Sequence, residues 1–182
     1  MKILVAGSYR FDMYAKAYHD AFRRLGHEVR ALDTDGFTFG RGGRLTGLSE
    51  KVKHHYLIGP AIGAADRALK REVREFKPDL VFLYQCYFFR PSAVKEISAQ
   101  TTVFSYDNDD PFDRRPSKHN SSNYLEYARW CKMNYVFRSK NVEDFHNIGV
   151  DNVKVMMPYY METHNFLSEY TKKVYFSIQE II

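Results

Sequence analysis

The chain has 182 residues, 45% of them hydrophobic and 27% charged, which fits one globular domain with its own core. Its net charge of +5 suits phosphate-bearing partners, but no run of five or more basic residues occurs, so we expect no nucleic-acid partner. Its two cysteines form no C-x-x-C pair, which fits the cytoplasm, and no apolar stretch approaches the ~20 residues that span a bilayer. We therefore expect a cytoplasmic protein with at most peripheral membrane contact.

The N-terminal part of the chain alternates strand and helix patterns. Residues 2–6 predict a buried strand that ends at Gly7, and residues 28–32 predict a second strand. Helical periodicity separates the two strands and stops at Gly26. One face of this helix is predicted from the apolar residues Met13, Ala17, Ala21 and Leu25, with Tyr14, Tyr18 and Phe22 beside it. A strand, a helix and a strand in this order form a βαβ unit, whose strands are parallel.

The middle of the chain continues the alternation. Residues 34–47 are rich in glycine and arginine and predict a positively charged loop. A helix is predicted over residues 60–76, and residues 80–84 are apolar throughout, as expected of a central parallel strand. The remaining predicted elements are a helix to about residue 99, a strand over 101–106, a helix over 123–131, a strand over 134–138, a helix over 142–147, a strand over 152–156 and a final helix from about 163.

This sustained alternation predicts an α/β fold with an open, doubly wound and mainly parallel sheet. In such sheets, ligands bind in the crevice at the carboxyl ends of the strands. The polar residues that follow predicted strands are therefore the candidate substrate-binding residues. They are Gly7, Ser8, Tyr9, Arg10, Gln85, Asp107, Asn108, Asp109, Asp110 and Arg138.

The loop after the first strand lacks the glycine pattern of dinucleotide-binding and P-loop proteins. Neither Gly-x-Gly-x-x-Gly nor Gly-x-x-x-x-Gly-Lys occurs, so we expect no dinucleotide cofactor and no P-loop chemistry. Gly7 permits a tight turn, Ser8 and Tyr9 offer hydroxyl groups, and Arg10 offers a bidentate cation. An ordinary turn with a solvated arginine explains the same residues equally well.

The segment Asp107-Asn-Asp-Asp110 is the densest polar cluster after any predicted strand. Three carboxylates in four positions repel one another and require a compensating partner, such as a sugar, a cation, or Arg114 and Arg115. Asp107-x-Asp109 also matches the Asp-x-Asp of metal-dependent sugar transferases, although two residues form a weak signal and we assign no metal site. Helix capping beside a turn at Pro111 is the simpler alternative.

Several segments, taken in order, resemble GT-B glycosyltransferases of the spore-maturation-protein-like and polysaccharide-biosynthesis branch. The first βαβ unit and Lys77-Pro-Asp-Leu-Val are similar to that superfamily in general. More specific are Ser105-Tyr-Asp-Asn-Asp-Asp-Pro-Phe, Tyr135-Val-Phe-Arg-Ser-Lys-Asn141, Gly149-Val-x-Asn-Val and Met157-Pro-Tyr-Tyr. The resemblance covers about residues 1–166.

The resemblance implies a Rossmann-like half of a GT-B fold that binds the acceptor. Residues 1–160 would form this acceptor-side domain, and residues 161–182 would form a C-terminal helix that crosses towards a donor domain not contained in the sequence. A nucleotide sugar would be the co-substrate, the acceptor would be a glycan or a lipid-linked molecule, and no cofactor would be held. Without a second Rossmann-like domain or chain we expect little or no turnover, and we assign no catalytic residue.

Two alternatives stay open at this point. The first is a compact metal-dependent transferase that uses Asp107-x-Asp109. The second is a non-catalytic Rossmann-like binding or assembly module with an apolar stripe on its final helix. That stripe would comprise Met161, Leu167, Tyr170, Val174, Tyr175, Ile178 and Ile182.

Overall fold

The computed structural model describes residues 1–38, 59–113, 115 and 120–157 of the chain. They form a six-stranded sheet with the strand order β2-β1-β3-β4-β5-β6, in which every neighbouring pair is parallel. The prediction of an open, doubly wound α/β sheet is confirmed. The strands are β1 (Lys2–Gly7), β2 (Glu28–Asp33), β3 (Leu80–Tyr84), β4 (Thr102–Asp107), β5 (Met133–Val136) and β6 (Val153–Val155).

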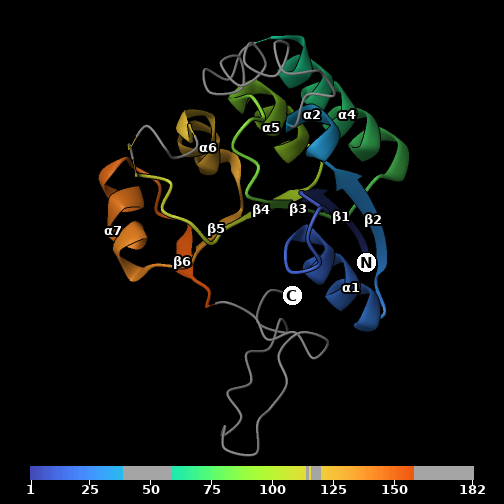
Figure 1. The fold of residues 1–182 in the computed structure, drawn as a ribbon, viewed down its shortest axis with the longest axis horizontal. Coiled ribbons are helices and arrows are strands. Elements are labelled where there is room, and N and C mark those ends of the chain that lie inside the picture. The colour runs from blue at the N-terminus through green and yellow to red at the C-terminus, as the bar shows by residue number, and fades with distance from the viewer. Residues whose placement is uncertain (39–58, 114, 116–119, 158–182) are drawn as a thin grey trace, which may run out of the picture.

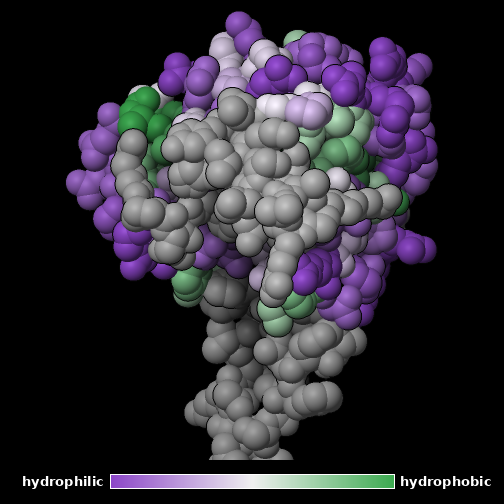
Figure 2. Space-filling model, turned by 45° about the horizontal axis from the view of Figure 1, so that its top comes forward, coloured by the Kyte–Doolittle hydropathy of each residue, from purple (hydrophilic) through white to green (hydrophobic). Residues whose placement is uncertain are grey.

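Helices cover both faces of the sheet (Figure 1). One face packs against α1, and the larger hydrophobic cluster joins the other face to the remaining long helices. The helices are α1 (Ala15–Arg24), α2 (Asp35–Thr38), α4 (Pro60–Phe76), α5 (Pro91–Ser98), α6 (Ser122–Tyr127) and α7 (Ser139–Asn147), with a short 3-10 helix η1 at Ala128–Trp130. Hydrophilic side chains predominate over the described part of the surface in Figure 2.

Local sequence explains the two elements that the pattern predicted best. The first residue of α4 is Pro60, whose fixed φ suits the first helical turn and whose missing N–H costs no intrahelical bond there. The helix ends where Lys77 takes the left-handed conformation. All five residues of β3 are buried, because this central strand has helices on both faces. The predicted bounds of both elements, 60–76 and 80–84, are confirmed.

The buried face of α1 differs from the prediction. Met13 and Leu25 lie outside the helix and are 52% and 40% exposed. The buried residues are Ala15, Tyr18 and Phe22, and the rings of Tyr18 and Phe22 lie 4.7 and 5.8 Å from the ring of Phe82 in β3. Large aromatic rings remove more apolar surface from water than the alanines of the predicted face. The helix therefore turns its aromatic side towards the sheet.

The strand order places a topological switch point between β1 and β3. From β1 the chain passes to β2 on one side, and it returns to form β3 on the other side of β1. The crevice for a ligand in this class of sheet lies at such a point, outside the carboxyl ends of the strands. Parallel register aligns Ala6 with Leu83, and Tyr84 with Tyr106, so the loops after β1, β3 and β4 leave the same edge.

Other boundaries shift or fall outside the described residues. Arg138, which the prediction placed at the end of a strand over 134–138, lies beyond β5 and is the residue before the first turn of α7. The predicted crossing helix at 161–182 and most of the glycine-rich segment 34–47 lie outside the described residues. Within the part that is described, no helix has both the length and the apolar character needed to cross a membrane.

Candidate functional site

The loop after β1 is shaped by close packing at Gly7. A Cβ atom on this residue would lie 2.7 Å from the Cβ of Ala15 in α1 and 3.0 Å from the Cβ of Tyr84 in β3. Only glycine therefore lets α1 start this close to the sheet. Gly7 is therefore a packing residue at the switch point. The tight strand-to-helix turn predicted for it is not seen, because residues 8–14 separate it from Ala15, the first residue of α1.

The next residues of this loop are held mainly by their own surroundings. The backbone N–H of Tyr9 donates to Asp35 Oδ2 at 3.2 Å, and its hydroxyl donates to the carbonyl of Val5 at 3.2 Å. Burial raises the pKa of the Tyr9 phenol, and the neighbouring charge of Asp33 raises it further. The N–H of Arg10 donates to Ser8 Oγ at 3.4 Å, and the Arg10 side chain is exposed. This loop therefore offers one cation and a Ser8 hydroxyl.

Gln85, the first residue after β3, has an unusual backbone and a central position. Its φ is +48°, a left-handed conformation that is uncommon outside glycine. Its N–H donates to the carbonyl of Tyr106 at 2.9 Å, which fixes this turn against β4. Its side-chain amide then lies 3.3 Å from Asp109 Oδ2 and 3.5 Å from Asp107 Oδ1. Strained backbone of this kind persists where the surroundings hold it, and it gathers at functional sites.

Asp107 is the last residue of β4 and its side chain is buried, with 1% of the residue exposed. Its Oδ1 accepts hydrogen bonds from the Tyr87 hydroxyl at 2.6 Å and from the Asp109 N–H at 2.9 Å. Its Oδ2 is buried and has no hydrogen-bond partner within the described residues. A buried carboxyl with one unsatisfied oxygen is costly when ionised and favours the protonated form.

This environment moves the titration of Asp107 towards neutrality. Burial raises the pKa of Asp107 to about 7, and the negative charge of Asp109 adds to the rise. The hydrogen bonds from Tyr87, the Asp109 N–H and Gln85 act in the opposite direction, because they stabilise the carboxylate. Burial raises the pKa more than these hydrogen bonds lower it, so the Asp107 carboxyl gains or loses its proton near neutral pH.

The other two aspartates of the loop 107–110, which we call the acidic loop, face different neighbours. Asp109 is partly exposed and faces Gln85, whereas Asp110 turns towards α7. Asp110 Oδ2 lies 3.6 Å from the guanidinium of Arg138, and its Oδ1 accepts from Asn141 Nδ2 at 2.8 Å. The Oδ1 of Asn108 is buried without a hydrogen-bond partner among the described residues. Only Asp109 combines a carboxylate, partial exposure and the Gln85 contact.

The structure joins some of the predicted site residues and separates others. It connects Gln85 with Asp107 and Asp109, and it connects Arg138 with Asp110. The loop from Ser8 to Arg10 leaves the same edge but makes its hydrogen bonds with β1, α1, α2 and its own residues. Arg115 forms its ion pair with Asp113 at 2.5 Å, and the charge of Asp110 makes a smaller contribution to the raised pKa of Arg115. Arg114 lies outside the described residues.

Two residues of this cluster were not among the ten candidate binding residues, although Tyr87 lies in the predicted loop Gln85-Cys-Tyr and Asn141 ends the segment from Tyr135 that carries the resemblance. Tyr87 donates the 2.6 Å hydrogen bond to Asp107, and Asn141 donates to Asp110. Tyr87 stands two residues after Gln85 in the same predicted loop, so its position was a usable signal. Asn141 follows Arg138 by three residues in the first turn of α7, and only knowledge of the helix start would have pointed to it.

The arrangement suits recognition of hydroxyl groups. Carboxylate oxygens accept hydrogen bonds and an amide both donates and accepts, so Asp109 and Gln85 together match the alternating donors and acceptors of a polyol. Arg10 and Arg138 add exposed cations to the same edge. In the described part of the chain, no group of three or more His, Cys, Asp or Glu side chains is placed to hold a metal ion. The Asp107-x-Asp109 metal hypothesis stays a prediction.

Comparison with known proteins adds no family to this description. No family model and no curated protein matches the chain.

Proposed function

We propose that this chain is the acceptor-binding domain of a glycosyltransferase, which transfers a sugar from a nucleotide sugar to a glycan or a lipid-linked acceptor. The observation that carries the proposal is the Gln85–Asp107–Asp109 cluster at the switch point of a doubly wound sheet. Its partly exposed carboxylate, Asp109, is the group best placed to accept hydrogen bonds from an acceptor's hydroxyls.

The loop after β1 supports an acceptor rather than a nucleotide at this edge. Dinucleotide and P-loop sites bind phosphates through free backbone N–H groups next to several glycines. Here the N–H of Tyr9 already donates to Asp35, and bulky residues follow Gly7. The exposed cations Arg10 and Arg138 instead suit the single charged end of a phosphorylated acceptor.

Asp107 acts in this proposal as a positioning residue. Its carboxyl is buried, and its Oδ1 accepts hydrogen bonds from both the Tyr87 hydroxyl and the Gln85 amide. Deprotonation of Asp107 strengthens both hydrogen bonds, because an ionised acceptor binds donors more strongly than a neutral one. Acceptor binding should therefore change as pH passes through about 7, the value to which burial raises the pKa of Asp107.

Sugar transfer requires a second unit for the donor. The described residues form one α/β sheet, and the proposed reaction needs preorganised groups that stabilise the leaving nucleoside diphosphate. In the proposal a further Rossmann-like domain or chain supplies these groups, and the nucleotide sugar is its ligand.

The proposal is tested by calorimetric titration with the methyl glycosides of glucose, galactose, mannose and N-acetylglucosamine and with the corresponding sugar 1-phosphates. We expect at least one of these probes to bind, and we expect Asp109→Asn to weaken it about tenfold or more, because one charge-assisted hydrogen bond is worth roughly 1.5–3 kcal/mol. Arg23→Gln, on the exposed end of α1, is the matched control and should bind like the wild type.

Two results would contradict the proposal. The first is binding that Asp109→Asn leaves unchanged, because the carboxylate would then have no part in recognition. The second is binding of a uridine diphosphate sugar that requires Mn²⁺ and is lost in Asp109→Ala. That second result would favour the metal-dependent transferase.

A further inference from the structure

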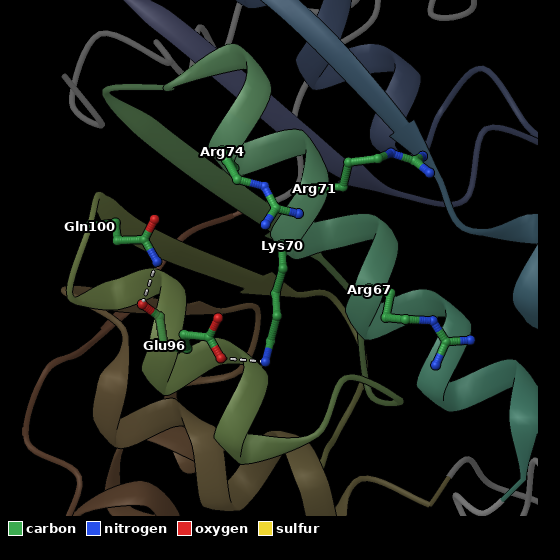
Figure 3. Close-up of a pocket in the computed structure, with 6 residues that line it drawn as sticks. All are labelled: Arg67, Lys70, Arg71, Arg74, Glu96 and Gln100. Carbon is green, nitrogen blue, oxygen red and sulfur yellow. Dashed lines mark hydrogen bonds and ion pairs between the residues drawn. The ribbon is translucent and has the colours of Figure 1, made fainter.

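The solvent face of α4 carries four cations, with Glu72 and the exposed Glu75 as its acidic neighbours on the same helix. Arg67, Lys70, Arg71 and Arg74 lie three or four residues apart, which places them on one side of the helix. We call these residues the basic face. Figure 3 shows Lys70 reaching towards α5, while Arg67 and Arg71 extend to the other side of the same face.

The spacing of the basic face is unfavourable for an isolated helix. Arg67 and Arg71 are four residues apart, and so are Lys70 and Arg74. Like charges at this spacing repel each other and destabilise the helix, whereas surface helices usually alternate the two signs. Because this repulsion between cations destabilises the free protein, an anionic partner that neutralises them would relieve it.

Ion pairs compensate only part of this charge. Lys70 pairs with Glu96 of α5, and Arg71 lies 3.4 Å from Glu72, which Arg30 also approaches at 3.3 Å. Within the described ranges, Arg67 and Arg74 have no carboxylate partner. The basic face therefore keeps an excess of positive charge.

The surface beside the basic face is hollowed and continues across α5. A groove of about 410 Å³ lies between α4 and α5 and is lined by the basic face together with Glu96 and Gln100. On α5, Lys95 lies 4.5 Å from the ring of Trp130, and this indole is 37% exposed. Exposed Trp beside Lys or Arg is the combination that settles at the headgroup level of a membrane.

The basic face is separate from the crevice at the carboxyl edge. Helix α4 ends at Phe76, and Asp79 then pairs with Lys2 at the amino end of β1. Arg74 and Gln100 thus approach the opposite edge of the sheet from Gln85 and Asp109. A ligand at one place leaves the other accessible, so binding at the basic face is independent of the proposed acceptor site.

We propose that the basic face of α4, together with the partly exposed Trp130 next to α5, docks on the phosphate headgroups of an anionic lipid bilayer. The four cations spread along an exposed helix and no buried donor converges on one point, which suits an extended anionic surface better than one bound phosphate. An exposed indole favours a bilayer over a nucleic acid, which would need several stacking rings or a groove-binding element.

The test is sedimentation of the full chain with vesicles at 50 and 300 mM salt. Vesicles of phosphatidylcholine alone and vesicles containing 30% phosphatidylglycerol are compared. We expect binding only to the anionic vesicles, with a marked loss at high salt. Each Lys or Arg near an anionic surface raises binding roughly fivefold, so Arg67→Gln/Arg74→Gln should lower the partition coefficient roughly 25-fold.

The matched control is Arg23→Gln/Arg24→Gln in the last turn of α1, which removes the same charge from the other side of the sheet. We expect this control to bind like the wild type, and circular dichroism should show all three proteins folded. The proposal is overturned if both variants lose binding equally, if Arg67→Gln/Arg74→Gln binds like the wild type, or if the wild type binds a single-stranded RNA but no vesicle. Displacement from vesicles by millimolar inorganic phosphate would also overturn it, since it would indicate a site for one small anion.

Discussion

Two polar regions of this molecule differ in whether their charged side chains are buried and hydrogen-bonded or exposed to solvent. At the carboxyl edge of the sheet, Asp107 is buried and its Oδ1 is held by Tyr87 and the Asp109 N–H. On the outer face of α4, Arg67 and Arg74 stand in solvent without a carboxylate partner among the described residues. The first region has fixed geometry and an altered pKa, and the second has an exposed excess of one charge.

The difference teaches what each region can recognise. A buried, hydrogen-bonded cluster holds its groups at fixed positions, so it suits a ligand of defined shape such as a sugar. An exposed row of flexible cations has no fixed geometry, so it suits a surface of many phosphates and depends on salt. The following predictions separate the two regions, from the largest expected effect to the smallest.

The largest effect is expected at Asp107. Because burial raises its pKa to about 7, the folded state holds a proton that the unfolded state releases near pH 4. The stabilisation from this carboxyl is therefore complete at low pH and lost as pH rises to about 7. Relative to Asp107→Asn, which cannot ionise, the wild type should lose about 3 kcal/mol of unfolding free energy between pH 5 and pH 8.

Urea unfolding of both proteins at the two pH values measures this difference directly. Because the other titrating groups are common to both proteins, their contributions cancel. If the difference in unfolding free energy between wild type and Asp107→Asn stays constant from pH 5 to pH 8, the Asp107 carboxyl is ionised over that whole range, as an exposed carboxyl would be.

Gly7→Ala tests whether the switch point is set by packing. The added Cβ would lie 2.7 Å from Ala15 Cβ and 3.0 Å from Tyr84 Cβ, so α1 must shift away from the sheet. Overpacking of this kind costs about 2 kcal/mol, and thermal unfolding should show a lower midpoint. The same substitution at Gly36, where the added atom meets nothing within 4 Å, is the control. Equal effects at the two glycines would argue against a packing role for Gly7.

Tyr87→Phe removes the hydroxyl that donates to Asp107 and leaves the ring in place. We expect a loss of about 1.5 kcal/mol at pH 8, where the acceptor is ionised, and a smaller loss at pH 5, where it is protonated. Since this hydrogen bond lowers the pKa of Asp107, its removal should raise that pKa further. If Tyr87→Phe lost more unfolding free energy at pH 5 than at pH 8, the Tyr87 hydroxyl would stabilise the protonated form of Asp107 and not the carboxylate, which would contradict this account.

The smallest effect on stability is expected at the basic face. Arg67→Gln/Arg74→Gln removes repulsion between residues four apart, so its unfolding free energy should match the wild type or exceed it by up to about 0.5 kcal/mol. Unfolding at 50 and 300 mM salt should show the gain mainly at low salt. A clear destabilisation at low salt would mean that these cations have structural partners.

Elements with strong local signals were predicted from the sequence. The bounds of α4 and β3 follow from Pro60 and from an unbroken apolar run, and neither depends on distant residues. The sequence pattern placed Tyr18 and Phe22 only beside the predicted face of α1. Their contacts with the ring of Phe82, some sixty residues after Phe22, turn that side of the helix towards the sheet. Periodicity gave a helix, and packing decided which side of it is buried.

The same limit applies to the candidate site. Strand ends pointed to Gln85 and to the acidic loop, because all parallel strands end at one edge. The sequence predicted repulsion among three carboxylates but could not tell how it is relieved. Asp110 turns to Asn141 and Arg138, while Asp107 is buried against Tyr87. These contacts join segments about twenty to thirty residues apart, and no local spacing encodes them.

The measurement that tests the proposed function most directly is a map of backbone amide shifts. The ¹⁵N-labelled chain is titrated with the tightest-binding glycoside or sugar 1-phosphate, in the wild type and in Asp109→Asn. We predict that the largest shifts fall on Gln85 and Asp109 at the carboxyl edge and that Asp109→Asn abolishes them. Shifts confined to Arg67, Arg74 and Gln100 in the groove of α4 and α5, or unchanged by Asp109→Asn, would contradict the assignment of this edge as an acceptor site.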